Sequence, residues 1–270
     1  GCCNIRRVEF TTLCYTRATS QTLKIGPWKI KSKSRYTKNR SGRSISLPHP
    51  IAITYEEAGD VIEHLGILPL SSFIPSHPSL VSITRPDAWH TGADTDPWLW
   101  RDRFAIEGIA AYGRFLGDKP LLISREMFPV MSCVLAQEET VEERYAAGLL
   151  AKATLRMYNC IRENDDIDVR TLRTLMGMQH ASDKSAFDRS LNELQNTAEV
   201  VISGISERLN PQGNKSGWNS TCYMLADNWM QRHGNVKAHL SPEQAKTQLY
   251  AWIEPRWEES AIQYLKKRLA

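Results

Sequence analysis

Two helix starts and two helix stops follow one another closely between residues 167 and 196, and few folds accommodate that pattern. Asp168 can cap a helix over residues 169–176, and Gly177 can end it. Ser182 to Lys184 can start a longer second helix that runs to about residue 196. The apolar residues at helical spacing are Leu172, Leu175 and Met176 in the first helix and Phe187, Leu191 and Leu194 in the second. Two helices joined by a tight turn predict a helix-turn-helix.

A β-hairpin is predicted directly after these helices. The β-branched run at residues 200–203 is typical of a strand, and residues 210–217 have the composition of a turn. Residues 220–223 can then return as the partner strand. A helix-turn-helix followed by a hairpin is the order of a winged helix, so we predict a winged-helix unit from about residue 165 to about residue 225.

The second helix and the hairpin carry side chains that suit DNA. These hydrogen-bond donors for phosphates and base edges are Lys184, Arg189, Asn192 and Gln195 on the expected exposed side of the helix, with Arg208 and Lys215 on the hairpin. We therefore predict that the unit binds double-stranded DNA. The same segment also holds acidic residues, which weaken the positive field, namely Asp183, Asp188, Glu193 and Glu199. Because winged helices also serve as packing or protein-interaction modules, a scaffold role stays open.

The positive net charge belongs to the first fifty residues. Residues 1–50 contain eleven Lys and Arg against one acid, Glu9, whereas residues 51–270 hold 23 basic and 29 acidic residues. The overall charge is therefore no argument for DNA binding by the rest of the chain. We expect this basic head to be disordered, and three interpretations stay open: an organellar transit segment, a nucleic-acid-binding arm, or a chain start that is not the natural one. We predict a cytoplasmic protein, or an organellar or nuclear one if the head is a targeting segment.

Residues 51–135 predict a mixed α/β region. Thr54 and Glu57 form a capping box that starts a helix ending at Gly66, and Asp96 before Pro97 starts another. A short strand is expected at residues 119–124, and the apolar run at 80–83 favours a loop or a short strand rather than a helix.

Residues 136–235 predict a winged-helix domain and residues 236–270 predict C-terminal helices. A capping box at Thr140 and Glu143 predicts one long helix to about Arg162, ahead of the helix-turn-helix. Near the end, Ser241 can cap a helix that Pro255 kinks or restarts. The predicted fold class is α+β, mainly helical: a winged helix-turn-helix unit with an N-terminal mixed α/β region and C-terminal helices.

Four segments together resemble the AlkZ-related family, winged-helix relatives of the bacterial DNA glycosylases that unhook interstrand crosslinks. They are residues 54–70 (the capping box, then Leu-Gly-Ile-Leu-Pro-Leu), 94–101 (Asp-Thr-Asp-Pro-Trp-Leu-Trp-Arg), 123–129 (Ile-Ser-Arg-Glu-Met-Phe-Pro) and 186–195. The resemblance spans residues 53–232 and implies a DNA-repair connection. The glycosylases use a Gln-x-Gln or Gln-x-Asp pair, and none of the glutamines in this chain is followed two residues later by Gln or Asp. The catalytic pair of those enzymes is therefore absent.

Carboxylates near a histidine are the strongest enzyme-like cluster. His90, Asp94 and Asp96, with Glu107 and Glu126 farther along the chain, could perform acid-base chemistry or hold a metal ion. The structural interpretation, which we favour, makes Asp96 a helix cap, Asp94 a turn residue and Glu126 the partner of an arginine. Trp98 and Trp100 could stack on a flipped base, or could pack in the core or cover it. The sequence shows no metal-ligand spacing, no phosphate loop and no C-x-x-C, so we predict no metal and no cofactor.

Binding to duplex DNA without catalysis, or with weak catalysis, is thus the function that the sequence favours. The alternatives are a glycosylase-like hydrolase that uses carboxylates near Asp94 and Asp96, and a protein-interaction scaffold. No membrane segment is expected, because no apolar run approaches about 20 residues. The oligomeric state does not follow from the sequence.

Overall fold

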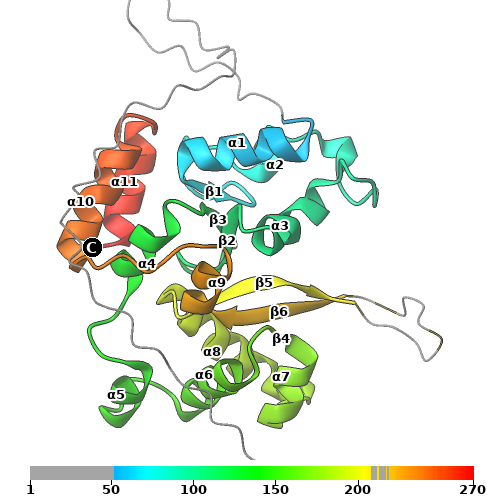
Figure 1. The fold of residues 1–270 in the computed structure, drawn as a ribbon, viewed down its shortest axis with the longest axis vertical. Helices are drawn as coiled ribbons and strands as arrows, with labels where there is room; N and C mark the ends of the chain where they lie inside the picture. The colour runs from blue at the N-terminus through cyan, green and yellow to red at the C-terminus, as the bar shows by residue number, and fades with distance from the viewer. Residues whose placement is uncertain (1–51, 208–211, 213–216, 218) are drawn as a thin grey trace, which may run out of the picture. The chain divides into compact units, whose positions relative to one another are not determined.

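The computed structural model describes residues 52–207, 212, 217 and 219–270, and these fold as an α+β protein with a small antiparallel sheet (Figure 1). The six strands lie in the order β1-β3-β2-β5-β6-β4. Their bounds are β1 Ile67–Pro69, β2 Ala110–Gly113, β3 Leu121–Ser124, β4 Ile167–Asp168, β5 Val200–Ser206 and β6 Ser220–Leu225. Only one register pair, Tyr112 opposite Ile202, joins β2 to β5. The sheet therefore consists of an early half and a late half that meet at that pair.

The early half contains the first four helices. They are α1 (Tyr55–Leu65), α2 (Leu80–Ile83), α3 (Pro97–Ile106) and α4 (Phe128–Leu135), with a short 3-10 helix at Pro86–Ala88. The capping box of Thr54 and the stop at Gly66 are confirmed, because Thr54 accepts the Glu57 N–H and Gly66 has a φ of 78°. The expectation of a loop or short strand at residues 80–83 was wrong. Ser79 and Ser82 form a capping box there, which stabilises one helical turn.

The long helix predicted from residue 140 is two helices. The capping box at Thr140 is confirmed, but α5 (Val141–Ala146) ends early and α6 (Lys152–Asn164) begins after a break. Gly148 lies in the break with a φ of 73°, a conformation that favours glycine. In the break Leu150 is buried and Leu149 is exposed, so the apolar residues of this segment do not form one continuous helical stripe.

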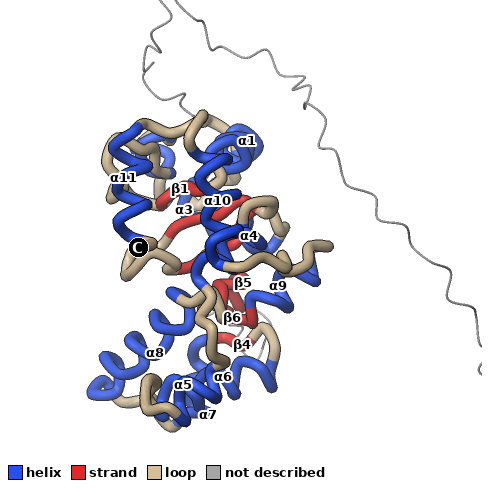
Figure 2. Tube along the Cα trace, turned by 90° about the vertical axis from the view of Figure 1, so that its left-hand side faces the viewer, coloured by secondary structure: helices blue, strands red, loops and turns tan. Residues whose placement is uncertain are grey.

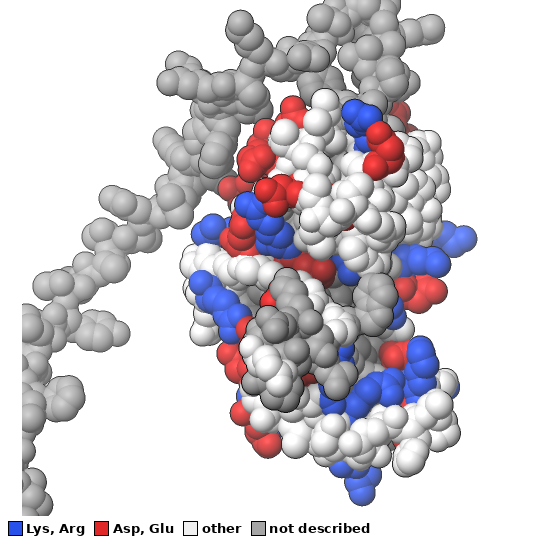
Figure 3. Space-filling model, turned by 90° about the vertical axis from the view of Figure 1, so that its right-hand side faces the viewer, with Lys and Arg blue, Asp and Glu red and all other residues white. Residues whose placement is uncertain are grey.

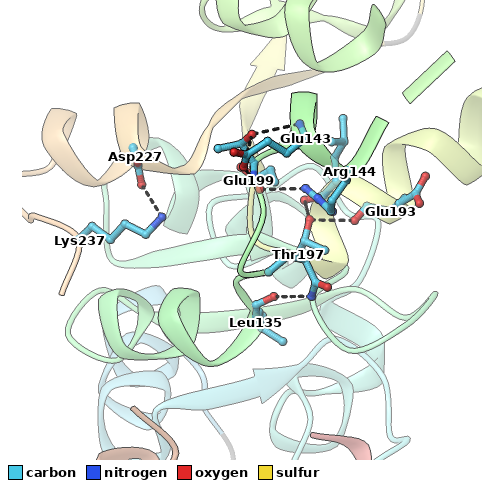
Figure 4. Close-up of polar contacts among 11 residues, drawn as sticks. Leu135, Glu143, Arg144, Glu193, Thr197, Glu199, Asp227 and Lys237 are labelled. Atoms are coloured by element: carbon cyan, nitrogen blue, oxygen red, sulfur yellow. Dashed lines mark hydrogen bonds and ion pairs between the residues drawn. The ribbon is translucent and has the colours of Figure 1, made fainter. Parts of the chain in front are cut away.

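A buried ion pair ties α5 to the start of the hairpin. The Arg144 Nη2 atom lies 3.1 Å from the Glu199 Oε1 atom, and the Arg144 side chain is only 7% exposed. Figure 4 shows Arg144 pointing at Glu199, with the Asp227–Lys237 pair beside them. Burial raises the pKa of Glu199, while Arg144 and Lys237 oppose that rise. The pair thus fixes α5, whose six residues could not hold their place by helix propensity alone.

The late half begins with β4, and two helices follow it: α7 (Val169–Met176) and α8 (Lys184–Asn196), joined by a 3-10 turn at Ala181–Asp183. The cap and the stop predicted for α7 are confirmed: Asp168 accepts the N–H groups of Arg170 and Thr171, and Gly177 is left-handed. Leu175, expected in the buried stripe, is instead 48% exposed. The strands β5 and β6 then pair with each other, and β4 pairs with β6.

The last three helices are α9 (Ala226–Arg232), α10 (Pro242–Ile253) and α11 (Glu259–Arg268). The capping by Ser241 and the new helix after Pro255 are confirmed. In Figure 2, α10 lies against α4 of the early half. The indole Nε1 of Trp257 donates to the Leu65 carbonyl at 2.9 Å, and that of Trp229 donates to the Ala105 carbonyl at 2.9 Å. These helices therefore close the core of the early half.

Candidate nucleic-acid interface

The exposed side of α8 carries a shallow depression. Its lining residues are Ala181, Ser182, Lys184, Ser185, Asp188, Arg189 and Asn192. Lys184 and Arg189 are exposed, as expected. Lys184 forms an i,i+4 ion pair with Asp188, which neutralises part of its charge. Arg189 has no hydrogen-bond or ion-pair partner among the described residues, so its guanidinium is available to a ligand.

Gln195 does not lie on the exposed side of α8. It is 1% exposed, its Oε1 accepts the backbone N–H of Arg114 at 3.0 Å, and its Nε2 donates to the Leu191 carbonyl at 3.2 Å. A buried amide needs such partners, because leaving it unpaired would cost about 1–3 kcal/mol. The expectation that Gln195 faces DNA is therefore corrected: its side chain anchors α8 to the end of β2.

Two further amides of α8 extend that anchor. Asn192 is half-buried, and its Oδ1 accepts from the Nη1 atom of Arg114 at 3.0 Å. Asn196 accepts the Gly117 N–H at 2.7 Å and donates to the Gly117 carbonyl at 3.1 Å. We call Asn192, Gln195 and Asn196 the amide bracket. It fixes α8 relative to the early half of the sheet.

Two of the residues expected on the interface belong to the hairpin. Arg208 and Lys215 lie outside the described residues. Figure 3 shows a face of the molecule on whose lower part several Lys and Arg side chains lie. Acidic side chains lie on the same face, so the field is mixed.

Asp96 is a structural carboxylate. It is 1% exposed and accepts three backbone N–H groups, from His90 at 3.0 Å, Gly92 at 2.9 Å and Trp98 at 2.9 Å. Burial acts to raise its pKa, but these three donors together outweigh burial and hold the pKa below the usual value. The N-cap role is thus confirmed, and the loop before α3 is folded around this side chain.

Asp94 and Glu126 do not join Asp96 in a cluster. Both are exposed, and no hydrogen bond or ion pair connects their side chains to Asp96 or to each other among the described residues. Asp94 contributes its backbone carbonyl, which accepts from the Trp100 Nε1 at 2.7 Å. No group of three or more His, Cys, Asp or Glu in the described part of the chain could hold a metal ion.

The two tryptophans at the start of α3 differ in environment. Trp100 is 2% exposed and belongs to the core, whereas Trp98 is 39% exposed. The guanidinium carbon of Arg101 lies 3.3 Å from the centre of a Trp98 ring, and the His90 ring lies 4.9 Å away. Arg101 therefore covers one face of Trp98, which leaves little room for a base to stack there.

A buried polar group between α3 and the sheet was missed by the sequence reasoning. Asp102 is 7% exposed, and burial raises its pKa although the Nε of Arg101 lies 3.3 Å from its Oδ2. Burial also raises the pKa of Tyr112 to about 12, with Arg101 and Arg114 opposing the rise. No motif marked these residues, because their burial depends on the packing of α3 against β2 and β5.

Two buried tyrosines, Tyr112 and Tyr223, lie on the same face of the sheet. Tyr112, Ile202 and Tyr223 stand opposite one another on three neighbouring strands, so their side chains share one face of the sheet. Burial raises the pKa of Tyr223, with Arg114 opposing it and Asp188 of α8 adding to it. Arg101 and Arg114 thus both oppose the rise in the pKa of Tyr112, and Arg114 also opposes that of Tyr223.

One comparison with known proteins gave a result. A family model described as AlkZ related matches residues 52–270, which is more than half of the chain. No curated protein and no solved structure matches. Within the described residues, no helix combines the length and the apolar character that crossing a membrane requires.

Proposed function

The chain belongs to the AlkZ-related family, and from this relationship we propose that its late half is a winged-helix unit that binds double-stranded DNA. The unit runs from about residue 165 to about residue 225. Its helix-turn-helix is α7 with α8, and its wing is the hairpin of β5 and β6. The pairing of β4 with β6 supports this assignment, because β4 precedes α7 directly and so connects both helices to the hairpin.

The observation that carries the proposal is the exposed side of α8. Arg189 lies there without a carboxylate partner, in the same depression as Lys184 and Asn192. A guanidinium of this kind suits phosphate oxygens and base edges in a groove of duplex DNA. The Lys184–Asp188 pair and the mixed charge of the face predict moderate affinity.

Fluorescence anisotropy with a labelled duplex tests DNA binding. We expect the logarithm of the association constant to fall linearly with the logarithm of the salt concentration, because bound counterions are released from the phosphates. Arg189→Ala should weaken binding and lower the magnitude of that slope by about one. Lys267→Ala, which removes an exposed cation from α11, is the matched control and should bind as the unaltered protein does. Affinity that is indifferent to salt and to Arg189→Ala would refute the proposal.

A second candidate is a hydrolase that acts on N-glycosidic bonds in DNA, and Asp102 favours it. The proposed chemistry adds a water oxygen to the sugar C1′ atom, breaks the C1′–N bond and releases the base with a proton. A buried carboxyl with a raised pKa could donate that proton and could then accept one from water. Asp96 suits the role less well, because three backbone donors occupy its carboxylate.

Release of bases from alkylated DNA separates the two candidates. Purified protein that generates no abasic sites, while it binds duplex DNA, supports binding without catalysis. If abasic sites form, Asp102→Asn should abolish their formation. Asp94→Asn should not, since Asp94 is exposed and its side chain has no hydrogen bond or ion pair with Asp102, Arg101 or Tyr112. Loss in Asp94→Asn alone would instead assign the chemistry to the loop before α3. A protein that fails both assays would support the scaffold alternative.

A further inference from the structure

Arg114 differs from several other arginines of the chain. Arg101, Arg144 and Arg232 each pair with a carboxylate, at 3.3 Å, 3.1 Å and 2.8 Å respectively. Arg114 follows β2, is half-buried, and forms no ion pair with any described carboxylate. The partner of its side chain is the neutral Oδ1 of Asn192, at 3.0 Å. A positive charge withdrawn partly from water without a counterion is costly unless a ligand supplies one.

The position of Arg114 is fixed from two sides. Its backbone N–H is held by Gln195 and its guanidinium by Asn192, so both ends of the residue are bound to α8. On the other side, its charge lies near the buried rings of Tyr112 and Tyr223 and opposes the rise of their pKa values. The acidic groups that also act on these tyrosines are Asp102 and Asp188, and neither forms an ion pair with Arg114. A prepositioned guanidinium loses little side-chain entropy when an anion binds.

The ligand is identified by what adjoins this guanidinium. Asn192 comes three residues after Arg189 on α8, so the two side chains share a helix face, and both line the same depression. A ligand that contacts Arg189 therefore passes close to Arg114. The groups of such a ligand that best suit a planar guanidinium without a counterion are its backbone phosphates, because their oxygens accept two parallel hydrogen bonds.

We propose that Arg114 binds a backbone phosphate of the duplex held by α8, and that Asn192 is the positioning residue that orients its guanidinium. The inference rests on the proposed function. It means that the bound strand is contacted by both halves of the sheet, the late half through Arg189 and the early half through Arg114. The contact reads the backbone rather than the sequence, because phosphates are the same at every base pair.

Asn192→Asp is the sharpest test. An aspartate has nearly the same shape and can still accept from Arg114, so the packing of α8 on β2 is kept, but it gives the guanidinium a counterion. We expect the affinity for a duplex of random sequence to fall roughly tenfold, while the melting temperature is retained or raised. Gln248→Glu adds the same charge on the exposed side of α10 and should leave the affinity unchanged.

Arg114→Ala and Arg114→Lys complete the design. The alanine variant should lower the magnitude of the salt slope by about one between about 50 and 200 mM salt, and lysine should restore part of it. If Arg189→Ala weakens binding whereas Asn192→Asp and Arg114→Ala bind as the unaltered protein does, the inference is wrong and the proposed function stands. If the unaltered protein does not bind duplex DNA at all, the proposed function fails and this inference fails with it.

Discussion

The side-chain Oε1 of Gln195 accepts the backbone N–H of Arg114 at 3.0 Å, although 81 positions separate the two residues in the chain. This bond connects the middle of the late half to the end of β2, at a place where only one register pair otherwise joins the two halves of the sheet. Gln195 therefore has a structural role that its position on α8 did not suggest.

Gln195→Leu should destabilise the protein. The substitution keeps the buried volume but leaves the Arg114 N–H without an acceptor, which costs about 1–3 kcal/mol in the free energy of unfolding. Urea unfolding followed by circular dichroism measures it. Gln248→Leu, at an exposed position of α10, is the control, with a change within about 0.5 kcal/mol. Equal effects at the two positions would show that the bond contributes nothing.

Asp96→Asn should reduce stability near neutral pH and remove part of its dependence on acid. The pKa of Asp96 is lower in the folded protein than in the unfolded chain, so its contribution is present above the unfolded value of about 4 and is lost as the pH falls through the folded value. Asparagine can still cap α3 through its Oδ1, but its NH2 group would replace the Oδ2 that accepts the Gly92 N–H, and the loss of that acceptor should cost about 1–3 kcal/mol at pH 7. Unfolding curves recorded from neutral to acidic pH, with Asp94→Asn as the exposed control, check both parts. An unchanged acid limb in Asp96→Asn would contradict the linkage.

Arg144→Met should alter the pH dependence of the free energy of unfolding. Its effect concerns the loss of stability as the pH rises, whereas that of Asp96→Asn concerns the loss as the pH falls. The pKa of Glu199 is raised in the folded protein, mainly by burial, so its contribution is largest below the unfolded value of about 4.3 and is lost as the pH rises through the folded value. Removing Arg144 takes away the nearest opposing cation and raises that pKa further. The decline in stability should then extend to higher pH, and it should vanish in Arg144→Met/Glu199→Gln. Identical pH profiles for Arg144→Met and the unaltered protein would exclude a coupling between the two side chains.

Asp188→Asn should strengthen binding to duplex DNA. The substitution releases the charge of Lys184 from its ion pair and removes a carboxylate from the depression on α8. Both effects favour phosphate contacts, so the dissociation constant should fall severalfold and the salt dependence should become steeper. Glu243→Gln removes one acid from the exposed start of α10 and serves as the charge-matched control. Weaker binding by Asp188→Asn would argue that this carboxylate itself contacts the ligand.

Helix boundaries were largely predictable from the sequence because capping is a local interaction. Thr54, Asp96, Thr140, Asp168 and Ser241 all cap the helices that their neighbours predicted. The break after α5 was missed, since a single Gly148 inside an apolar pattern is compatible with both a continuous and an interrupted helix.

The candidate site was less predictable, because its geometry depends on contacts between distant segments. The helical spacing put Gln195 near the polar side of α8, whereas its pairing with Arg114, in another half of the sheet, decides that it is buried. The burial of Asp102 was not predictable for the same reason. It comes from the packing of α3 on the hairpin, and nothing within residues 97–106 indicates that this side chain is buried. Residue type and helical spacing correctly predicted that Arg189 and Lys184 are exposed cations.

The register pair between Tyr112 and Ile202 matters for whether the late half can be produced as a separate fragment. A fragment limited to residues 136–235 would lose β2, and with it the strand that shields the outer edge of β5. It would also lose the Ala105 carbonyl that receives the indole N–H of the buried Trp229. An open, apolar strand edge is a template for pairing with other chains, so we expect such a fragment to aggregate rather than to persist as a free domain.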